Sequence, residues 1–159
     1  MNNLRDSAKR VQEILHQYNI DAKVVEFTEL TRTSQEAANT IGCEVGQIAK
    51  TLIFKGKNSG QPVCIIASGV NRVDEKKVSG HIGEPIERAD PDFVLKWTGF
   101  AIGGVAPIGF KLESAVLIDE DLMGYPEIWA AAGTPYAVFQ LSPINLLKIT
   151  HGQVANIKK

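Results

Sequence analysis

The sequence predicts an α/β protein in which a mixed β-sheet is covered by helices. Segments with helical apolar spacing alternate with apolar segments of strand length, in an order that begins helix, strand, helix and continues with strands interrupted by helices. No internal repeat, low-complexity stretch or linker breaks this order. We therefore expect the 159 residues to form a single domain, residues 1–159, around one buried core.

Helix signals mark five segments. The first helix is expected to begin at Asn3, a favoured N-cap residue, and its inward face would carry Leu4, Ala8, Val11, Ile14 and Leu15. Thr33 and Glu36 have the spacing of a capping box, and Gly42 is the residue type that commonly ends a helix. Three later helices are expected to follow cap residues, two of which precede a proline: Asp74, Asp90 and Ser142.

Strand signals fill the intervals between these helices. The clearest hairpin joins residues 49–55 to residues 62–68 through a turn rich in glycine, asparagine and serine. Residues 119–126 are expected to form a turn. Shorter strands are expected over 23–27, 114–118, 128–133, 136–141 and 154–157.

Residues 99–109, GFAIGGVAPIG, are expected to form a loop, because each interior glycine costs a helix about 1 kcal/mol and proline disrupts helices and central strands. Gly103 and Gly104 can adopt positive φ and let a ligand approach the main chain, and Pro107 stiffens the far end. Successive amides in such a turn can converge on an oxyanion or a carbonyl. The alternative is a glycine-rich connection without a ligand. A Walker A loop is excluded because Phe110 stands where its lysine is required, and the glycine spacing does not match a dinucleotide-binding fingerprint.

Composition and charge exclude several classes. A net charge of −1 argues against a protein that grips long stretches of nucleic acid, so no DNA partner is expected. No apolar run resembles a signal peptide or a membrane span, so we expect a cytoplasmic protein with no membrane partner. Cys43 and Cys64 are far apart and the three histidines are scattered, so we expect no disulfide framework, no metal site and no cofactor.

No strong nucleophile is evident. No serine occupies a GxSxG turn, Cys64 lies in an apolar strand, and Cys43 lies beside Glu44 rather than in an electropositive setting. The consecutive carboxylates at 119–121 are expected to form a solvated cap rather than an acid–base pair. Each cysteine is expected to be a small buried or half-buried residue.

Lys50 opens an apolar strand. A lysine in that position is usually a solvated strand end, and the alternative is a cation held at the mouth of a pocket. Together with the glycine loop, this alternative describes a pocket that binds a carbonyl compound and positions water for hydrolysis, or a plain binding pocket.

Five segments resemble, in order, the YbaK/prolyl-tRNA synthetase-associated editing-domain family: AKTLIF at 49–54, GVNRVD at 69–74, GFAIGGVAPIG at 99–109, LIDEDL at 117–122 and AAG at 131–133. The resemblance spans the chain from the second helix to the last. It implies a free-standing aminoacyl-tRNA deacylase that removes a wrongly attached amino acid, most often from proline tRNA.

The resemblance also implies roles for individual residues. Lys50 occupies the position of the family lysine that contacts substrate and would fix the ribose or phosphate region. Main-chain amides at Gly103 and Gly104 would polarise the ester carbonyl, and water would attack without covalent catalysis. The substrate-binding positions implied are Val105, Ala106, Pro107, Ala131 and Gly133.

The partner implied is the acceptor end of a mischarged tRNA, with a synthetase as a further candidate partner. A modest basic patch for it would comprise Arg32, Arg72, Lys76 and Lys77. Ala131 and Val138 replace polar residues of cysteine-clearing members, and AAAGTPY lacks the histidine common in alanine-clearing members. TRTS at 31–34 with AAGTP at 131–135 resembles members that act on alanine or 2-aminobutyrate.

Two alternatives from other classes remain open. One is a non-catalytic module of the same fold that binds tRNA or a synthetase. The other is a pocket for small amino-acid derivatives that is unconnected with tRNA.

Overall fold

A computed structural model of the chain describes residues 6–29, 31 and 33–159. Within them an eight-stranded mixed sheet has the order β1-β7-β6-β2-β3-β5-β8, and β4 pairs with the end of β2. The predicted α/β class with a mixed sheet is confirmed. The strands are β1 (Val24–Glu26), β2 (Ile48–Gly56), β3 (Pro62–Ser68), β4 (Ile86–Arg88), β5 (Ala115–Asp119), β6 (Ile128–Ala131), β7 (Ala137–Leu141) and β8 (Gln153–Ala155).

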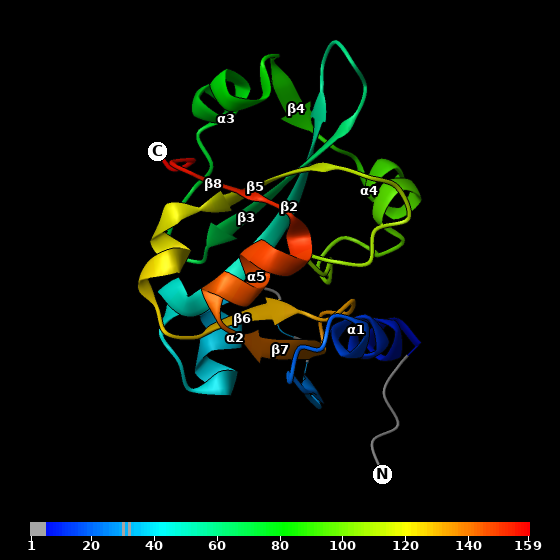
Figure 1. Ribbon diagram of the computed structural model, residues 1–159, viewed down its shortest axis with the longest axis vertical. Coiled ribbons are helices and arrows are strands. Elements are labelled where there is room, and N and C mark those ends of the chain that lie inside the picture. The colour runs from blue at the N-terminus through cyan, green and yellow to red at the C-terminus, as the bar shows by residue number, and fades with distance from the viewer. Residues whose placement is uncertain (1–5, 30, 32) are drawn as a thin grey trace.

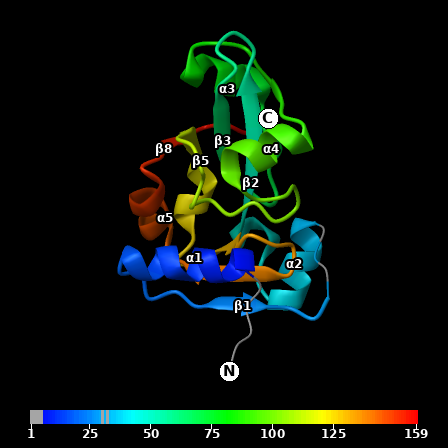
Figure 2. The same ribbon diagram turned by 90° about the vertical axis from the view of Figure 1, so that its right-hand side faces the viewer.

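Helices cover the sheet and its ends. Figures 1 and 2 show α1 beside β1 and β7 at one end of the molecule, and α3 near the tip of the β2–β3 hairpin at the other. No helix in the described residues is long and apolar enough to cross a membrane. The α-helices are α1 (Asp6–Gln17), α2 (Ser34–Ile41), α3 (Glu75–Ile82), α4 (Pro91–Thr98) and α5 (Pro143–Thr150), and the 3₁₀ helices are η1 (Val45–Gln47) and η2 (Glu120–Gly124).

Strand β3 is the centre of the core, because all seven of its residues are buried. Alternate side chains enter two different apolar clusters. Cys64 and Ile66 pack with the buried face of α1, whereas Val63 and Ile65 pack with Val78 of α3. The continuous apolar run PVCIIAS therefore reflects a strand that is covered on both faces.

The predicted helix caps that lie within the described residues are confirmed. Thr33 Oγ1 accepts the Glu36 amide at 3.1 Å, and Gly42 ends α2 with φ of 85°. The Thr33 contact satisfies a main-chain donor at the start of α2, and the Gly42 amide donates to the main-chain oxygen of Ala38 at its end. The other expected N-caps also accept main-chain amides: Asp74, Asp90 and Ser142.

Some elements differ from the prediction. Strand β4 was not predicted, because IER has no apolar run and forms only where β2 offers a free edge. The expected turn after residue 119 contains η2, and η1 was also not predicted. The final strand is Gln153–Ala155, and Ile157 is fully buried beyond it. The expected first-helix residues Asn3 and Leu4 lie outside the described residues.

Candidate functional site

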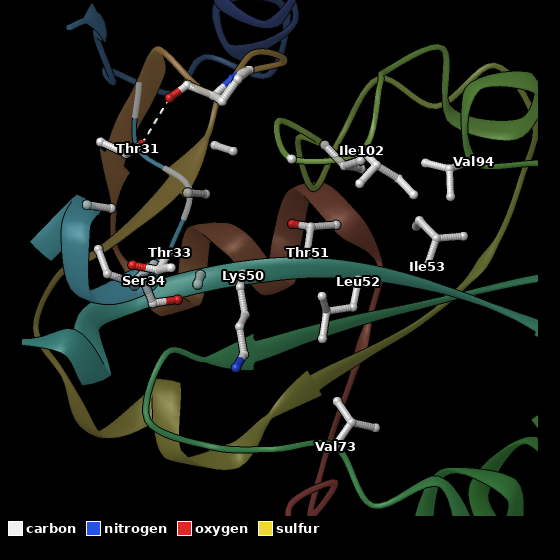
Figure 3. A pocket seen from close by; sticks show the side chains of 18 of the residues that line it. Thr31, Thr33, Ser34, Lys50, Thr51, Leu52, Ile53, Val73, Val94 and Ile102 are labelled. Carbon is white, nitrogen blue, oxygen red and sulfur yellow. Dashed lines mark hydrogen bonds between the residues drawn. The ribbon is translucent and has the colours of Figure 1, made fainter. Parts of the chain in front are cut away.

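A cavity of about 730 Å³ lies beside β2. Its size suits a small ligand or one end of a larger one, since such sites usually measure about 300–1,000 Å³. Segments far apart in the sequence form its wall, as Figure 3 shows for 18 of the residues. They come from Thr31 and the segment 33–37, from β2, β4, α4, β6 and β7, from the segment after β3, from the loop after α4, from the turn between β6 and β7, and from Lys159.

Strand β2 has a gap along one edge. It pairs with β3 along residues 49–55, but on its other edge β6 pairs only at Ile48 and Ala49 and β4 only from Phe54 onward. Residues 50–53 thus have no strand on that side in the described part of the chain. The cavity reaches both faces of the sheet here, because side chains from each face of this segment line it.

Side chains along this segment point alternately to opposite faces, as they must in a strand. Figure 3 shows Thr51 and Ile53 directed toward Ile102, and Lys50 and Leu52 directed to the other side. The structure therefore places the predicted lysine and the loop bearing Gly103 on the same cavity, but on opposite sides of β2.

Lys50 is half-buried and held by the loop after β3. Its Nζ donates a hydrogen bond to the main-chain oxygen of Asn71 at 2.7 Å. Burial, and next the charge of Arg72, lower the pKa of Lys50, while the Asp119 carboxylate acts in the opposite direction. Lys50 therefore lies at a pocket. Of the two interpretations that the sequence left open, the structure agrees with a cation held at a pocket and not with a solvated strand end.

The side chain of Asn71 anchors this loop. Its Nδ2 donates to Asp119 Oδ2 at 2.7 Å and to Asp121 Oδ2 at 2.8 Å, which uses both amide hydrogens. Asp119 Oδ2 also accepts the main-chain amide of Ser68 at 3.0 Å. A chain of bonds thus runs from a buried carboxylate through Asn71 to Lys50.

The prediction of a solvated acidic cap was wrong for Asp119. This side chain does cap η2, through the Asp121 amide at 2.9 Å, but it is completely buried. A buried carboxylate needs several donors, and these come from β3 and from Asn71, which the sequence does not place nearby. Only the run of apolar residues before Asp119 hinted at burial.

The glycine loop is packed against the turn after β6. A Cβ atom on Gly104 would lie 2.4 Å from the main-chain carbon of Thr134, and the Gly104 amide donates to Ala101 at 3.2 Å. Gly103 is exposed, has φ of 99°, and lines the cavity. Of the two predicted amide donors, only that of Gly104 is engaged within the loop in this conformation.

The predicted substrate-binding residues divide into two groups. Val105 and Ala131 line the cavity. Ala106 and Pro107 are the buried part of the glycine loop. Gly133 has φ of 89° and lies close to Ser7. Ala106, Pro107 and Gly133 are therefore buried residues that do not line the cavity.

Described residues of the two segments singled out for specificity line the same cavity: Thr31, Thr33 and Ser34 from the first, and Ala131, Thr134 and Pro135 from the second. Thr31 Oγ1 donates to the main-chain oxygen of Pro135 at 2.9 Å, the dashed contact in Figure 3. Val138 also lines this part of the cavity. The contact with Pro135 ties the segment before α2 to the turn that supports Gly104.

Charged side chains border the cavity where β2, β4 and the end of the chain approach one another. Three cationic residues and one acidic residue, Glu75, line it there; the cationic ones are Arg72, Arg88 and Lys159. Lys77 contacts the main-chain oxygen of Lys158 at 2.7 Å instead, and Lys76 is exposed without lining the cavity. The remaining predicted patch residue, Arg32, lies outside the described residues.

The cysteines offer no activated nucleophile. Cys64 is completely buried, and burial raises the pKa of its thiol far above the usual value. Burial, offset in part by a backbone hydrogen bond, also raises the pKa of Cys43. In the residues that the structure describes, no three histidine, cysteine or acidic side chains gather as a metal site would need.

The structure is an α/β domain with a mixed sheet and a cavity beside β2, lined by apolar and hydroxyl side chains and bordered by charged ones. The chain belongs to the aminoacyl-tRNA editing domain family, whose model matches residues 28–149. The family resemblance expected from the five sequence segments is thereby confirmed.

Individual relatives agree with this assignment. The uncharacterized protein YwhH of Bacillus subtilis is 32% identical, with 93% of this chain and 94% of YwhH covered. EbsC of Enterococcus faecalis, named as a candidate Cys-tRNA(Pro)/Cys-tRNA(Cys) deacylase, is 30% identical, with 91% and 89% covered. The crystal structure of a candidate trans-editing enzyme for prolyl tRNA synthetase is 46% identical, with a TM-score of 0.93 and 99% of both chains covered.

Proposed function

We propose that this protein is a trans-editing deacylase that hydrolyses the ester of tRNA(Pro) mischarged with alanine or 2-aminobutyrate. The observation that carries the proposal is a cavity whose wall includes apolar side chains such as Ala131 and Val138 and several hydroxyl side chains, with three cationic residues and Glu75 at its border. An aminoacylated acceptor end has matching chemistry, because a small apolar side chain precedes a ribose and a chain of phosphates. The comparison proteins named for deacylation or trans-editing support the same activity.

The proposed chemistry uses water as the nucleophile. Lys50, held by Asn71, would orient the ribose or the terminal phosphate. The exposed Gly103 turn would hold the ester carbonyl, since amides that face a developing oxyanion favour the transition state over the ground state. Positioning replaces covalent catalysis in this scheme.

The residues that line the cavity favour a substrate whose amino acid has a small aliphatic side chain. EbsC is named for cysteinyl substrates, whereas Ala131 and Val138 contribute apolar side chains to the wall of this cavity. One methylene changes binding by only about 1–3 kcal/mol, so alanine and 2-aminobutyrate are expected to be cleaved at rates within about two orders of magnitude.

The deciding experiment is deacylation of tRNA(Pro) charged separately with alanine, 2-aminobutyrate, serine, cysteine and proline. The expected result is rapid loss of the alanine or 2-aminobutyrate ester, with the proline ester spared, and loss of activity in Lys50→Ala. Lys57→Ala is the matched control, because Lys57 is an exposed lysine beyond the end of β2 and does not line the cavity.

Survival of every ester at high protein concentration would contradict the enzyme assignment for this tRNA. Retained binding of the charged tRNA would then identify the non-catalytic module. Binding of free aminoacyl compounds alone would identify the small-molecule pocket.

A further inference from the structure

The open segment of β2 presents the main chain of Thr51 to the cavity. Ile48 accepts a hydrogen bond from Gly69 and Gly56 donates one to Gln61, so the even-numbered residues of β2 direct their main-chain groups toward β3. Residues of odd number face the other edge, as the bond from Lys57 to Pro85 on the β4 side confirms. The N–H and C=O of Thr51 therefore face the gap between β6 and β4.

The side chain of Thr51 adds a second observation. Its Oγ1 is buried and has no hydrogen-bond partner in the described part of the chain. Buried hydroxyls are nearly always paired, since an unpaired one loses its bonds to water without replacement. Thr51 lines the cavity, and rotation about χ1 exchanges its hydroxyl with its methyl group and turns the oxygen toward a ligand.

The gap spans residues 50–53 of β2, so the main-chain groups of Thr51 and Ile53 both face it, and one residue of a strand partner is enough to pair with Thr51. In an antiparallel hydrogen-bonded pair, two residues exchange both N–H···O bonds, so one residue with an amine and a carbonyl completes the pair. An aminoacyl ester carries that pair of groups on one Cα. A ribose or a phosphate does not, and the cationic side chains that suit a phosphate are at the border: Arg72, Arg88 and Lys159.

We propose that the aminoacyl group docks at Thr51 as a one-residue strand. The C=O and the hydroxyl of Thr51 accept hydrogen bonds from the α-amino group, and the N–H of Thr51 joins the Gly103 turn as a donor to the ester carbonyl. The side chain of the amino acid then lies among the apolar residues of the cavity: Ile53, Ile102, Val105 and Ala131. This assignment rests on the proposed function and makes a free α-amino group a requirement for recognition.

The test compares three proteins on two esters of the same tRNA. The proteins are wild type, Thr51→Val, which removes the hydroxyl at nearly constant volume, and Thr51→Ser, which retains it. The esters are alanyl and propionyl, which differ only in the α-amino group. After kcat/KM for each ester is divided by the rate of its uncatalysed hydrolysis, we expect wild type to favour the alanyl ester over the propionyl ester at least about tenfold.

Thr51→Val should lower kcat/KM for the alanyl ester by about tenfold or more and change that for the propionyl ester less than twofold. Thr51→Ser, which keeps the hydroxyl, should retain most of the wild-type kcat/KM for the alanyl ester. Equal losses on both esters would indicate a structural role and overturn the proposal. Unchanged alanyl activity in Thr51→Val, or equal cleavage of both esters by wild type after division by the uncatalysed rates, would overturn it as well.

Binding separates this inference from the proposed function. Alanyl and propionyl 3′-amides of adenosine cannot be hydrolysed as esters and are titrated against the same three proteins. Tighter binding of the alanyl amide, lost in Thr51→Val and kept in Thr51→Ser, supports docking at Thr51 even if no ester is cleaved. Equal binding of both amides to wild type contradicts docking whatever the activity.

Discussion

The ammonium nitrogen of Lys50 lies 2.7 Å from the main-chain oxygen of Asn71, and the side chain of Asn71 is fixed by Asp119 and Asp121. This relationship explains how a lysine on a strand keeps a defined position in a cavity. The buried carboxylate of Asp119 fixes Asn71, and Asn71 fixes the lysine.

Replacing Asn71 with alanine should release Lys50 and leave Asp119 with fewer donors. The loss of a hydrogen bond to a buried carboxylate is expected to lower the free energy of unfolding by about 1–3 kcal/mol. Urea unfolding measures this change, and deacylation under conditions where the variant is folded should fall at least about tenfold. Val70→Ala, an exposed change in the same loop, is the control. Full activity in folded Asn71→Ala would contradict the anchoring role.

Replacing Gly104 with alanine should distort the loop, because the new Cβ would lie 2.4 Å from the main chain of Thr134. We expect a loss of about 1–3 kcal/mol in the free energy of unfolding. Gly124→Ala is the matched control, since a Cβ there meets nothing within 4 Å and that glycine does not have positive φ. Equal stability of the two variants, measured by urea unfolding, would disprove the packing argument.

Acid should weaken the contribution of Asp121 to stability. Hydrogen bonds from Lys158 and from Asn71 lower the pKa of this carboxyl. Because the pKa of this carboxyl is lower in the folded than in the unfolded protein, its ionised form stabilises the folded state at pH values above the unfolded pKa of about 3.9. This contribution is lost as the pH falls through the folded pKa. The free-energy difference between wild type and Asp121→Asn should therefore be constant above about pH 5 and shrink toward pH 2.

Urea unfolding at a series of pH values measures that difference. Glu120→Gln alters an exposed neighbouring carboxylate and controls for the general effect of removing one negative charge. A difference for Asp121→Asn that grows as pH falls would show that the sign of the linkage is wrong.

Narrowing the cavity at Ala131 should change which amino acid is cleaved. Ala131→Val adds two methyl groups to the wall, so the longer side chain of 2-aminobutyrate should lose more than that of alanine. We expect the ratio of kcat/KM for the 2-aminobutyrate ester over the alanine ester to fall about tenfold. Ala115→Val, on exposed β5 surface, should leave this ratio unchanged. A constant ratio in Ala131→Val would remove Ala131 from the substrate-binding site.

The cationic border should determine the salt dependence of tRNA binding. Arg88→Gln is expected to reduce the slope of log K against log salt by about 0.7–1 if the arginine contacts one phosphate. Filter binding or fluorescence anisotropy at several salt concentrations measures the slope. Lys57→Gln should leave it unchanged, and an equal effect of both variants would indicate a general charge effect instead.

Much of the local structure was predictable because its causes are local. Thr33 with Glu36, and Asp90 before Pro91, define helix starts through bonds within three residues. The hairpin of residues 48–68 follows from two apolar runs around a short turn. Lys50 and Gly103, which the sequence singles out, both line the cavity, and their catalytic roles stay a prediction. Strand β4 was missed, because its pairing depends on β2 and not on its own residues.

The sequence by itself determined the fold class, the helix caps and the identity of the family, since each depends on short-range chemistry or on motif order. Only the tertiary structure decided that Asp119 is buried, that Asn71 holds Lys50, and that Thr51 faces a gap in the sheet. The gap exists because β6 and β4 pair with different ends of β2. Such a property belongs to three strands together, and no single segment encodes it.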